Sequence, residues 1–103
     1  MVVTLKEEAR KLLSEVPEEY VFRCRDGLIL RNMEQLKNAL MTMESDVYSF
    51  HANSEKNDFA NWVKDIIKDD KLANSLQKAT GQSQAARLTA SRLATFSRRL
   101  AHP

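Results

Sequence analysis

The chain has 103 residues, of which 43% are hydrophobic and 29% charged, with two glycines, two prolines, one cysteine and a formal net charge of +2. This length suits one small domain, and the low glycine and proline content favours helix. No apolar run reaches the roughly 20 residues that a membrane span needs. The N-terminus lacks the long apolar stretch of a secretory signal. Cys24 is the only cysteine, which argues against a cysteine-based metal site. We therefore expect a cytoplasmic protein without a cofactor.

The N-terminal segment carries the signals of one helix. Thr4 and Glu7 have the spacing of a capping box, in which each side chain accepts a hydrogen bond from the other residue's backbone N–H. Apolar residues follow at helical spacing as far as Val16, and Pro17 disfavours helical geometry in the residue before it. We expect this helix to end at the proline.

Two short apolar runs surround Asp26 and Gly27, and we expect a β-hairpin at about residues 20–31. Asp-Gly favours a two-residue turn, since both residues can take a positive φ. A two-stranded hairpin is marginal alone, so it must lie on the helices. Either the face of Tyr20, Phe22 and Cys24 or the opposite face is turned inward. The alternative is an extended segment without regular pairing.

Four N-cap candidates divide the middle of the chain into short helices, because their side-chain oxygens can accept an N–H of the first turn. The candidates are Asn32, Ser45, Asn57 and either Asp69 or Asp70. The densest apolar spacing follows Asn57, and it predicts a helix from about residue 58 to residue 68. The stripe consists of Phe59, Trp62, Val63, Ile66 and Ile67. Gly81 is expected to end the last of these helices.

The segment 81–103 differs from the rest in its charge. It has four arginines and no acidic residue, which leaves residues 1–80 with a net charge of −2. The arginines are Arg87, Arg92, Arg98 and Arg99. Its apolar residues gather within an arc of roughly 140° on a helical wheel. We expect a basic C-terminal helix or tail, ordered when docked, attached to a single helical domain at residues 1–80.

Together these segments predict a mainly α fold, a small helical domain of about five or six short helices with one N-terminal β-hairpin. The apolar positions that face inward in this arrangement give a core of ten residues. They are Leu12, Phe22, Leu36, Leu40, Phe50, Phe59, Trp62, Val63, Ile66 and Leu72.

Three runs carry a resemblance: Asp26-Gly27 in the hairpin, Phe50-His51-Ala52-Asn53, and Asn57-Asp58-Phe59-Ala60-Asn61-Trp62. Through them, the stretch from about residue 17 to residue 76 resembles a prokaryotic family of small domains of unknown function. The resemblance implies one compact domain. It implies no activity, cofactor or catalytic residue, and the basic segment lies outside it.

His51, Asn53, Asn57 and Asp58 are the polar residues gathered around one predicted helix start. Free amides and the positive end of the helix dipole suit a small ligand or an anion, and His51 can supply a proton or a donor. Alternatively, these groups satisfy one another and the loop backbone. We favour this structural interpretation, because the carboxylate of Asp58 already compensates the dipole.

Other chemistry has little support in the sequence. A metal site needs three or four ligands, and Cys24 and His102 lie in other segments than His51. Arg23 and Arg25 flank Cys24 and could lower its pKa, although a small buried thiol on a strand is the commoner case. We assign no catalytic residue and no metal ligand.

Three classes of function remain open. The first is a non-enzymatic interaction module that binds a protein partner, or a second copy of itself, beside the Asn57 helix start and through the basic segment. The second is a nucleic-acid-binding protein that uses the four arginines, with strong salt dependence. The third is a small ligand-binding or enzymatic site around His51. A membrane surface is a further alternative for the basic segment. The sequence favours the first class.

Overall fold

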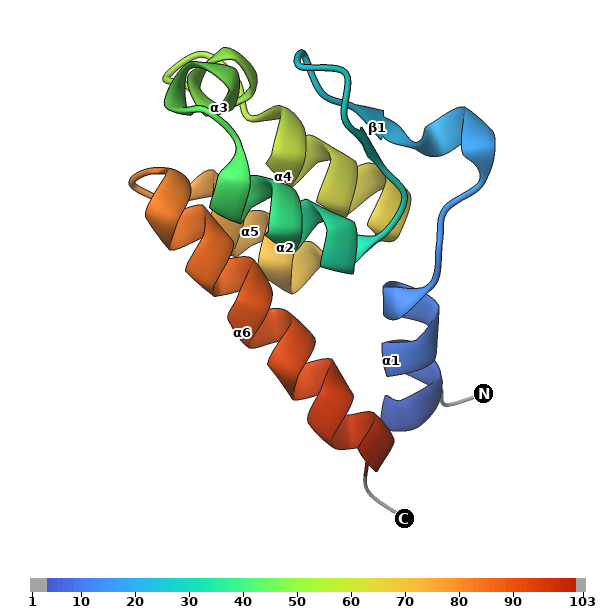
Figure 1. The fold of residues 1–103 in the computed structure, drawn as a ribbon. Helices are drawn as coiled ribbons and strands as arrows, with labels where there is room; N and C mark the ends of the chain where they lie inside the picture. The colour runs from blue at the N-terminus through green and yellow to red at the C-terminus, as the bar shows by residue number, and fades with distance from the viewer. Residues whose placement is uncertain (1–3, 102–103) are drawn as a thin grey trace.

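The computed structural model describes residues 4–101 and has six α-helices and one two-stranded antiparallel hairpin (Figure 1). The predicted mainly α fold with an N-terminal hairpin is confirmed. In chain order the elements are α1 (Leu5–Leu13), the short 3-10 turn η1 (Glu18–Tyr20), β1 (Phe22–Arg23), β2 (Ile29–Leu30), α2 (Met33–Thr42), α3 (Ser45–His51), α4 (Asp58–Trp62), the π-helical turn η2 (Val63–Ile67), α5 (Asp70–Gln77) and α6 (Gln82–Ala101). None of the helices in this described range has the length and apolar content that crossing a bilayer requires.

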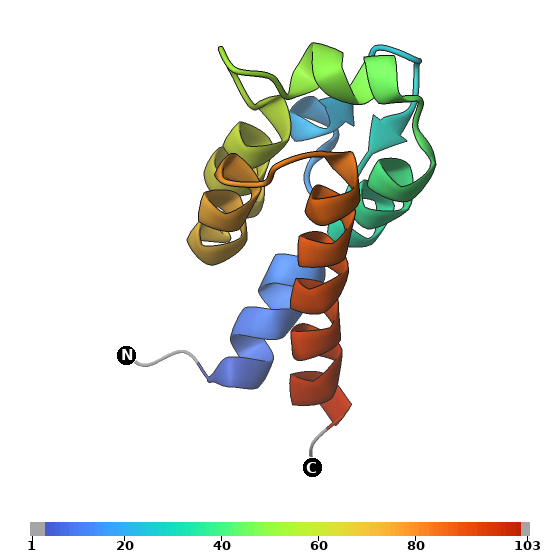
Figure 2. The same ribbon diagram turned by 90° about the vertical axis from the view of Figure 1, so that its left-hand side faces the viewer.

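Helix α6 is the longest element, and the other helices are arranged around it. It packs on α2, α1 and α5, and Figures 1 and 2 show α1 beside its C-terminal half, running in the opposite direction. Helices α3 and α4 and the hairpin lie at the other end of the molecule. All six helices and both strands supply residues to one apolar core. The boundary expected near residue 80 falls in the connection between α5 and α6, across which this core continues.

Eight of the ten predicted core residues are buried, and two are not. Ile66 is half-buried and packs on the edge of the core. Phe50 is 43% exposed, so its assignment to the core is wrong. Its ring lies on the outer face of α3 between Arg25 and Lys56, with the two cations 4.5 and 4.8 Å from the ring centroid. The neighbouring His51 takes the buried position instead.

The hairpin has a different turn from the predicted one. Phe22 lies opposite Leu30, and the side chains of Phe22 and Cys24 are buried. Three residues form the loop, since the N–H of Cys24 donates to Leu28 O and the N–H of Gly27 donates to Cys24 O. Gly27, with φ +94°, is the only residue of the loop with a positive φ. A three-residue loop of this kind needs one such residue, and glycine takes the conformation without strain.

The side-chain oxygen of Thr4 accepts the N–H of Glu7 at 3.1 Å, as predicted. Of the four N-caps predicted for the middle of the chain, three are confirmed. The side chains of Asn32, Asn57 and Asp69 each accept a backbone N–H from the first turn of the helix that follows, at 2.9, 3.0 and 3.3 Å. Ser45 is not a cap, because α3 begins at Ser45 and Glu44 occupies the cap position without a side-chain bond. Gly81 does not end α5, which stops at Gln77; the carbonyl of Gly81 instead accepts the N–H of Ala85 at the start of α6.

Two helices end earlier than predicted. Helix α1 ends at Leu13, and the extended chain beyond it lets the N–H of Val16 donate to Arg31 O at 2.8 Å. The regular α-helix after Asn57 ends at Trp62 and continues as the wider turn η2, which stops at Lys68 in the left-handed conformation, φ 72°. A π-helical turn departs from the 3.6-residue spacing, which accounts for the half-exposed position of Ile66.

Candidate functional site

His51 is a buried residue that ties α3, α4 and the hairpin together. Its Nε2 accepts the backbone N–H of Arg25 at 3.0 Å, and its Nδ1 lies 3.0 Å from a carboxylate oxygen of Asp58. Because Nε2 is an acceptor, the ring proton is on Nδ1 and is donated to Asp58. The ring also packs against Phe22 and Phe59, with centroids 5.1 and 5.3 Å away. Both ring nitrogens are therefore engaged within the protein.

Asn53 and Asn57 are separated from that pair and line a polar hollow of about 340 Å³. Asn53 donates to Ser49 O and accepts two backbone N–H groups of its own loop. Asn57 caps α4 with its oxygen and donates its amide to Leu76 O at 3.0 Å. The structure thus brings His51 to Asp58 and places Asn53 near Asn57, but the four residues do not line one cavity. Their contacts are those of caps and loop anchors.

Cys24 is buried, and burial raises the pKa of its thiol from 9.0 to about 11, with the negative charge of Asp26 adding to the effect. The idea that the flanking arginines lower this pKa is wrong, because the side chains of Arg23 and Arg25 are exposed and their charges are solvated. A protonated, enclosed thiol is a poor nucleophile.

The raised pKa of Cys24 predicts a loss of stability in alkali. Between pH 9 and pH 11 the unfolded chain releases the thiol proton and the folded chain keeps it, so the free energy of unfolding falls as the pH rises. The shift corresponds to roughly 2 kcal/mol over this window. Urea denaturation across the window should show a shallower decline for Cys24→Ala. Burial also raises the pKa of Tyr48, so Tyr48→Phe is the variant that removes the second contribution.

A decline of the same slope in Cys24→Ala and in the parent protein would contradict this assignment. The remaining slope would then belong to Tyr48 or to groups on the surface.

The four arginines of α6 do not share one face. Arg92 reaches inward and forms two hydrogen bonds to the carboxylate of Asp69, at 2.8 and 3.1 Å. Arg99 lies 3.4 Å from Glu8 on α1. Arg87 and Arg98 are exposed. Two of the four predicted contacts for nucleic acid are therefore held by carboxylates of the same chain.

A largely apolar hollow lies between β2 and α2. This β2–α2 hollow has a volume of about 520 Å³ and is lined by Leu28, Ile29, Gln35, Asn38, Met41 and Thr42, among others. A second hollow of about 480 Å³, the α2–α6 hollow, is lined by Leu40, Met41, Gln82, Ser83, Ala86 and Arg87. Met41 belongs to both. We call the two hollows and the residues that line them the Met41 surface.

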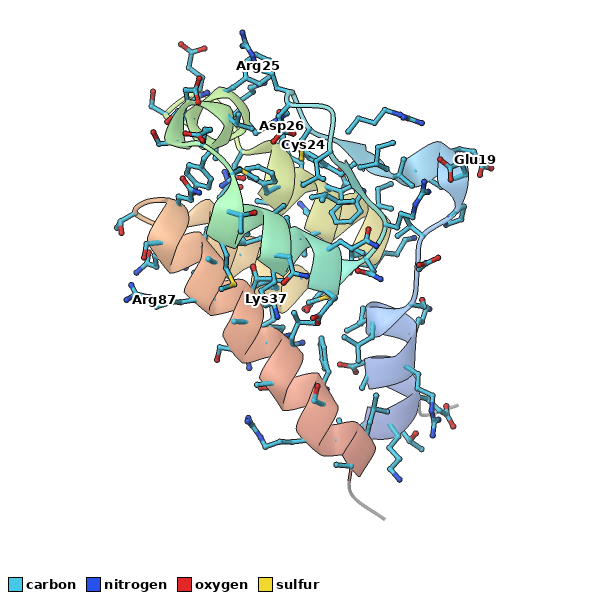
Figure 3. The ribbon with its side chains drawn as sticks, in the orientation of Figure 1. Glu19, Cys24, Arg25, Asp26, Lys37 and Arg87 are labelled. Atoms are coloured by element: carbon cyan, nitrogen blue, oxygen red, sulfur yellow. The ribbon has the colours of Figure 1, made fainter. Side chains whose placement is uncertain are left out.

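The Met41 surface combines exposed apolar side chains with positive charge. Met41 is 64% exposed and Leu28 is 47% exposed. Among the residues that line either hollow, Arg87 carries the only charge. Lys37 lies one helical turn before Met41, with its ammonium 3.3 Å from the carboxylate of Glu34. Figure 3 shows Lys37 and Arg87 on the side of the molecule where α2 meets α6.

Sequence reasoning missed this surface, although one signal was present. The ten residues predicted for the core do not include Met41. On a helical wheel of α2 it lies beside Glu34, Lys37 and Asn38, which are the polar residues of that helix. An apolar residue among polar residues on a helical wheel predicts an exposed side chain. It does not predict the hollows that α2 forms with β2 and α6.

Comparison of the chain with protein-family models, with curated proteins and with solved structures gave no match. The resemblance drawn from the sequence therefore stays a prediction, and the site has to be judged from its geometry. Within residues 4–101, no three side chains of His, Cys, Asp or Glu come together as metal ligands would. His102 lies outside the described residues.

Proposed function

We propose that this protein is a non-enzymatic interaction module that binds a segment of a partner protein on the Met41 surface. The observation that carries the proposal is the exposure of Met41 between two hollows. It is the most exposed large apolar side chain of the described residues, and it has a hollow on each side. Met side chains adapt to differently shaped partners, and covering such a group removes apolar area from water.

The other exposed apolar residues give less support to a docking site. The ring of Phe50 already contacts two cations of the same chain, those of Arg25 and Lys56. Leu5 and Tyr20 line none of the hollows described above. The Met41 surface joins several partly exposed apolar groups across three elements, and such a continuous patch is typical of a protein-binding site.

The alternative functions have less support from the contacts. A ligand-binding or enzymatic site around His51 would need a free ring nitrogen, and both are used by Arg25 and Asp58. A nucleic-acid-binding surface on α6 would have to rely on Arg87 and Arg98, since Arg92 and Arg99 are paired. Binding to nucleic acid is accordingly an outcome that the experiment must be able to reveal.

The test is a selection of short random peptides on the intact protein, followed by NMR mapping of the bound peptide. We expect the selected peptides to shift the amide signals of Leu28, Met41 and Ser83. Met41→Glu should weaken their binding by about tenfold or more, as loss of a central interface residue does. Leu5→Glu is the matched control, because Leu5 is nearly as exposed as Met41 and lies elsewhere.

Three results would overturn the proposal. One is a set of peptides whose binding is equally strong to Met41→Glu. Another is self-association of the protein that Met41→Glu abolishes, since the partner would then be a second copy. The third is that no peptide binds, while duplex DNA or RNA at low salt shifts the signals of Arg87 and Arg98.

A further inference from the structure

We infer that the partner segment is acidic and straddles Met41, with one apolar side chain in each hollow and a carboxylate on Arg87. This inference rests on the proposed function and names the partner's chemistry. It follows from the shape of the Met41 surface and from the sign of its charge.

The shape requires two anchors. The β2–α2 hollow is apolar on its β2 side, where Leu28 and Ile29 line it, and polar at Asn38 and Thr42. The α2–α6 hollow lies on the other side of α2 and has Ala86 as its apolar lining from α6. Met41 forms the wall between them, because it lines both. A bound segment that covers the exposed Met41 side chain therefore places one side chain in each of the two hollows.

The positive charge of Arg87 favours a partner that carries a carboxylate. Arg87 lines the α2–α6 hollow, and no carboxylate among the described residues lies within ion-pair distance of its guanidinium. No acidic residue lines either hollow. An arginine can bind a carboxylate through two parallel hydrogen bonds, which fixes the direction of the bound segment as well as adding affinity.

The same charge argues against a second copy of this chain as the occupant. In a two-fold dimer formed by the Met41 surface, each copy would present the same residues to the other. Arg87 would then face a surface whose only lining charge is another Arg87. A partner with apolar side chains and Asp or Glu residues avoids this repulsion.

The experiment fills one hollow at a time and compares binding of the peptides selected above. Asn38→Phe adds a ring at the exposed edge of the β2–α2 hollow, and Ser83→Phe does the same at the α2–α6 hollow. Each variant should weaken binding about tenfold or more if both hollows hold anchors. Both positions are exposed, so the variants should fold; an unchanged amide spectrum away from the substitution checks this.

The carboxylate is tested by charge variants and by salt. Arg87→Gln should weaken binding about two- to fivefold, the range of an exposed ion pair, and should flatten the salt dependence of the affinity. Arg98→Gln is the matched control, since Arg98 lies exposed on the same helix and lines neither hollow. The selected peptides should be enriched in Asp and Glu next to two apolar residues.

The outcomes separate the inference from the proposed function. If only one of Asn38→Phe and Ser83→Phe weakens binding, while Met41→Glu still weakens it about tenfold or more, the straddling arrangement is wrong. The proposal of an interaction module is then unaffected. If Arg87→Gln and Arg98→Gln behave alike, the carboxylate assignment is wrong. If Met41→Glu, Asn38→Phe and Ser83→Phe all bind normally, both the inference and the proposed function fall.

Discussion

Replacing Arg92 with methionine should lower the free energy of unfolding by about 3–5 kcal/mol, the range seen when one partner of a buried ion pair is removed. The carboxylate of Asp69 is 2% exposed and accepts two hydrogen bonds from Arg92, at 2.8 and 3.1 Å. Methionine keeps most of the side-chain volume but leaves this charge buried without a cation. Urea denaturation followed by circular dichroism measures the loss.

A double substitution separates the charge from the cap. Asp69 also caps α5 through the N–H of Leu72, and asparagine can do the same. Asp69→Asn combined with Arg92→Met should therefore be more stable than Arg92→Met alone. Arg98→Met, at an exposed position of the same helix, should change stability by no more than about 0.5 kcal/mol. A loss below about 1 kcal/mol for Arg92→Met would mean that the pair behaves like a surface ion pair.

His51→Ala should cost about 3 kcal/mol of stability. Each of its two hydrogen bonds contributes roughly 1 kcal/mol, and the loss of the ring contacts and the cavity left behind account for the rest. The substitution leaves the N–H of Arg25 without its acceptor, so the amide signals of the hairpin loop should shift the most. Urea denaturation and an amide NMR spectrum provide the two measurements.

The control for His51 is its neighbour Phe50. Phe50→Ala removes a larger ring from an exposed position and should cost less than about 1 kcal/mol. If His51→Ala were as mild as Phe50→Ala, the imidazole would not be needed to hold the hairpin. A function for His51 in binding or catalysis would then regain support.

Features that depend on neighbouring residues were predictable from the sequence. The caps of Asn32, Asn57 and Asp69 were identified because the amides they accept lie three residues ahead. Ser45 and Gly81 were misassigned for a related reason. Serine and glycine favour helix boundaries in general, and the sequence alone did not show which side of the boundary each would occupy.

Features that depend on distant residues were not predictable. Asp69 and Arg92 are 23 residues apart, and each had a sufficient local explanation, one as a cap and the other as an arginine of the basic segment. In the two-turn helix α3, the sequence placed Phe50 in the core, although it is His51 that is buried. The hairpin decided between them, because it offers the N–H of Arg25 to His51 and the guanidinium of the same residue to Phe50.

The candidate site shows the same limit. The polar residues around Asn57 were recognised, but their partners lie on other elements, such as Leu76 O for Asn57 and the Arg25 N–H for His51. The hollows beside Met41 are formed by β2, α2 and α6, which lie up to about 50 residues apart. A surface of this kind exists only once the three elements are packed.

The opposite directions of α1 and α6 have a consequence for how the domain can be connected. The start of α1 and the end of α6 lie at the same end of the molecule (Figures 1 and 2). Arg99 of α6 pairs with Glu8 of α1. A short linker could therefore join the two ends, and new ends could be opened in the exposed loop at Ser54 without cutting a helix or a strand. By the same geometry, a loop of a host protein could carry residues 4–101 as an insertion and remain closed at its base.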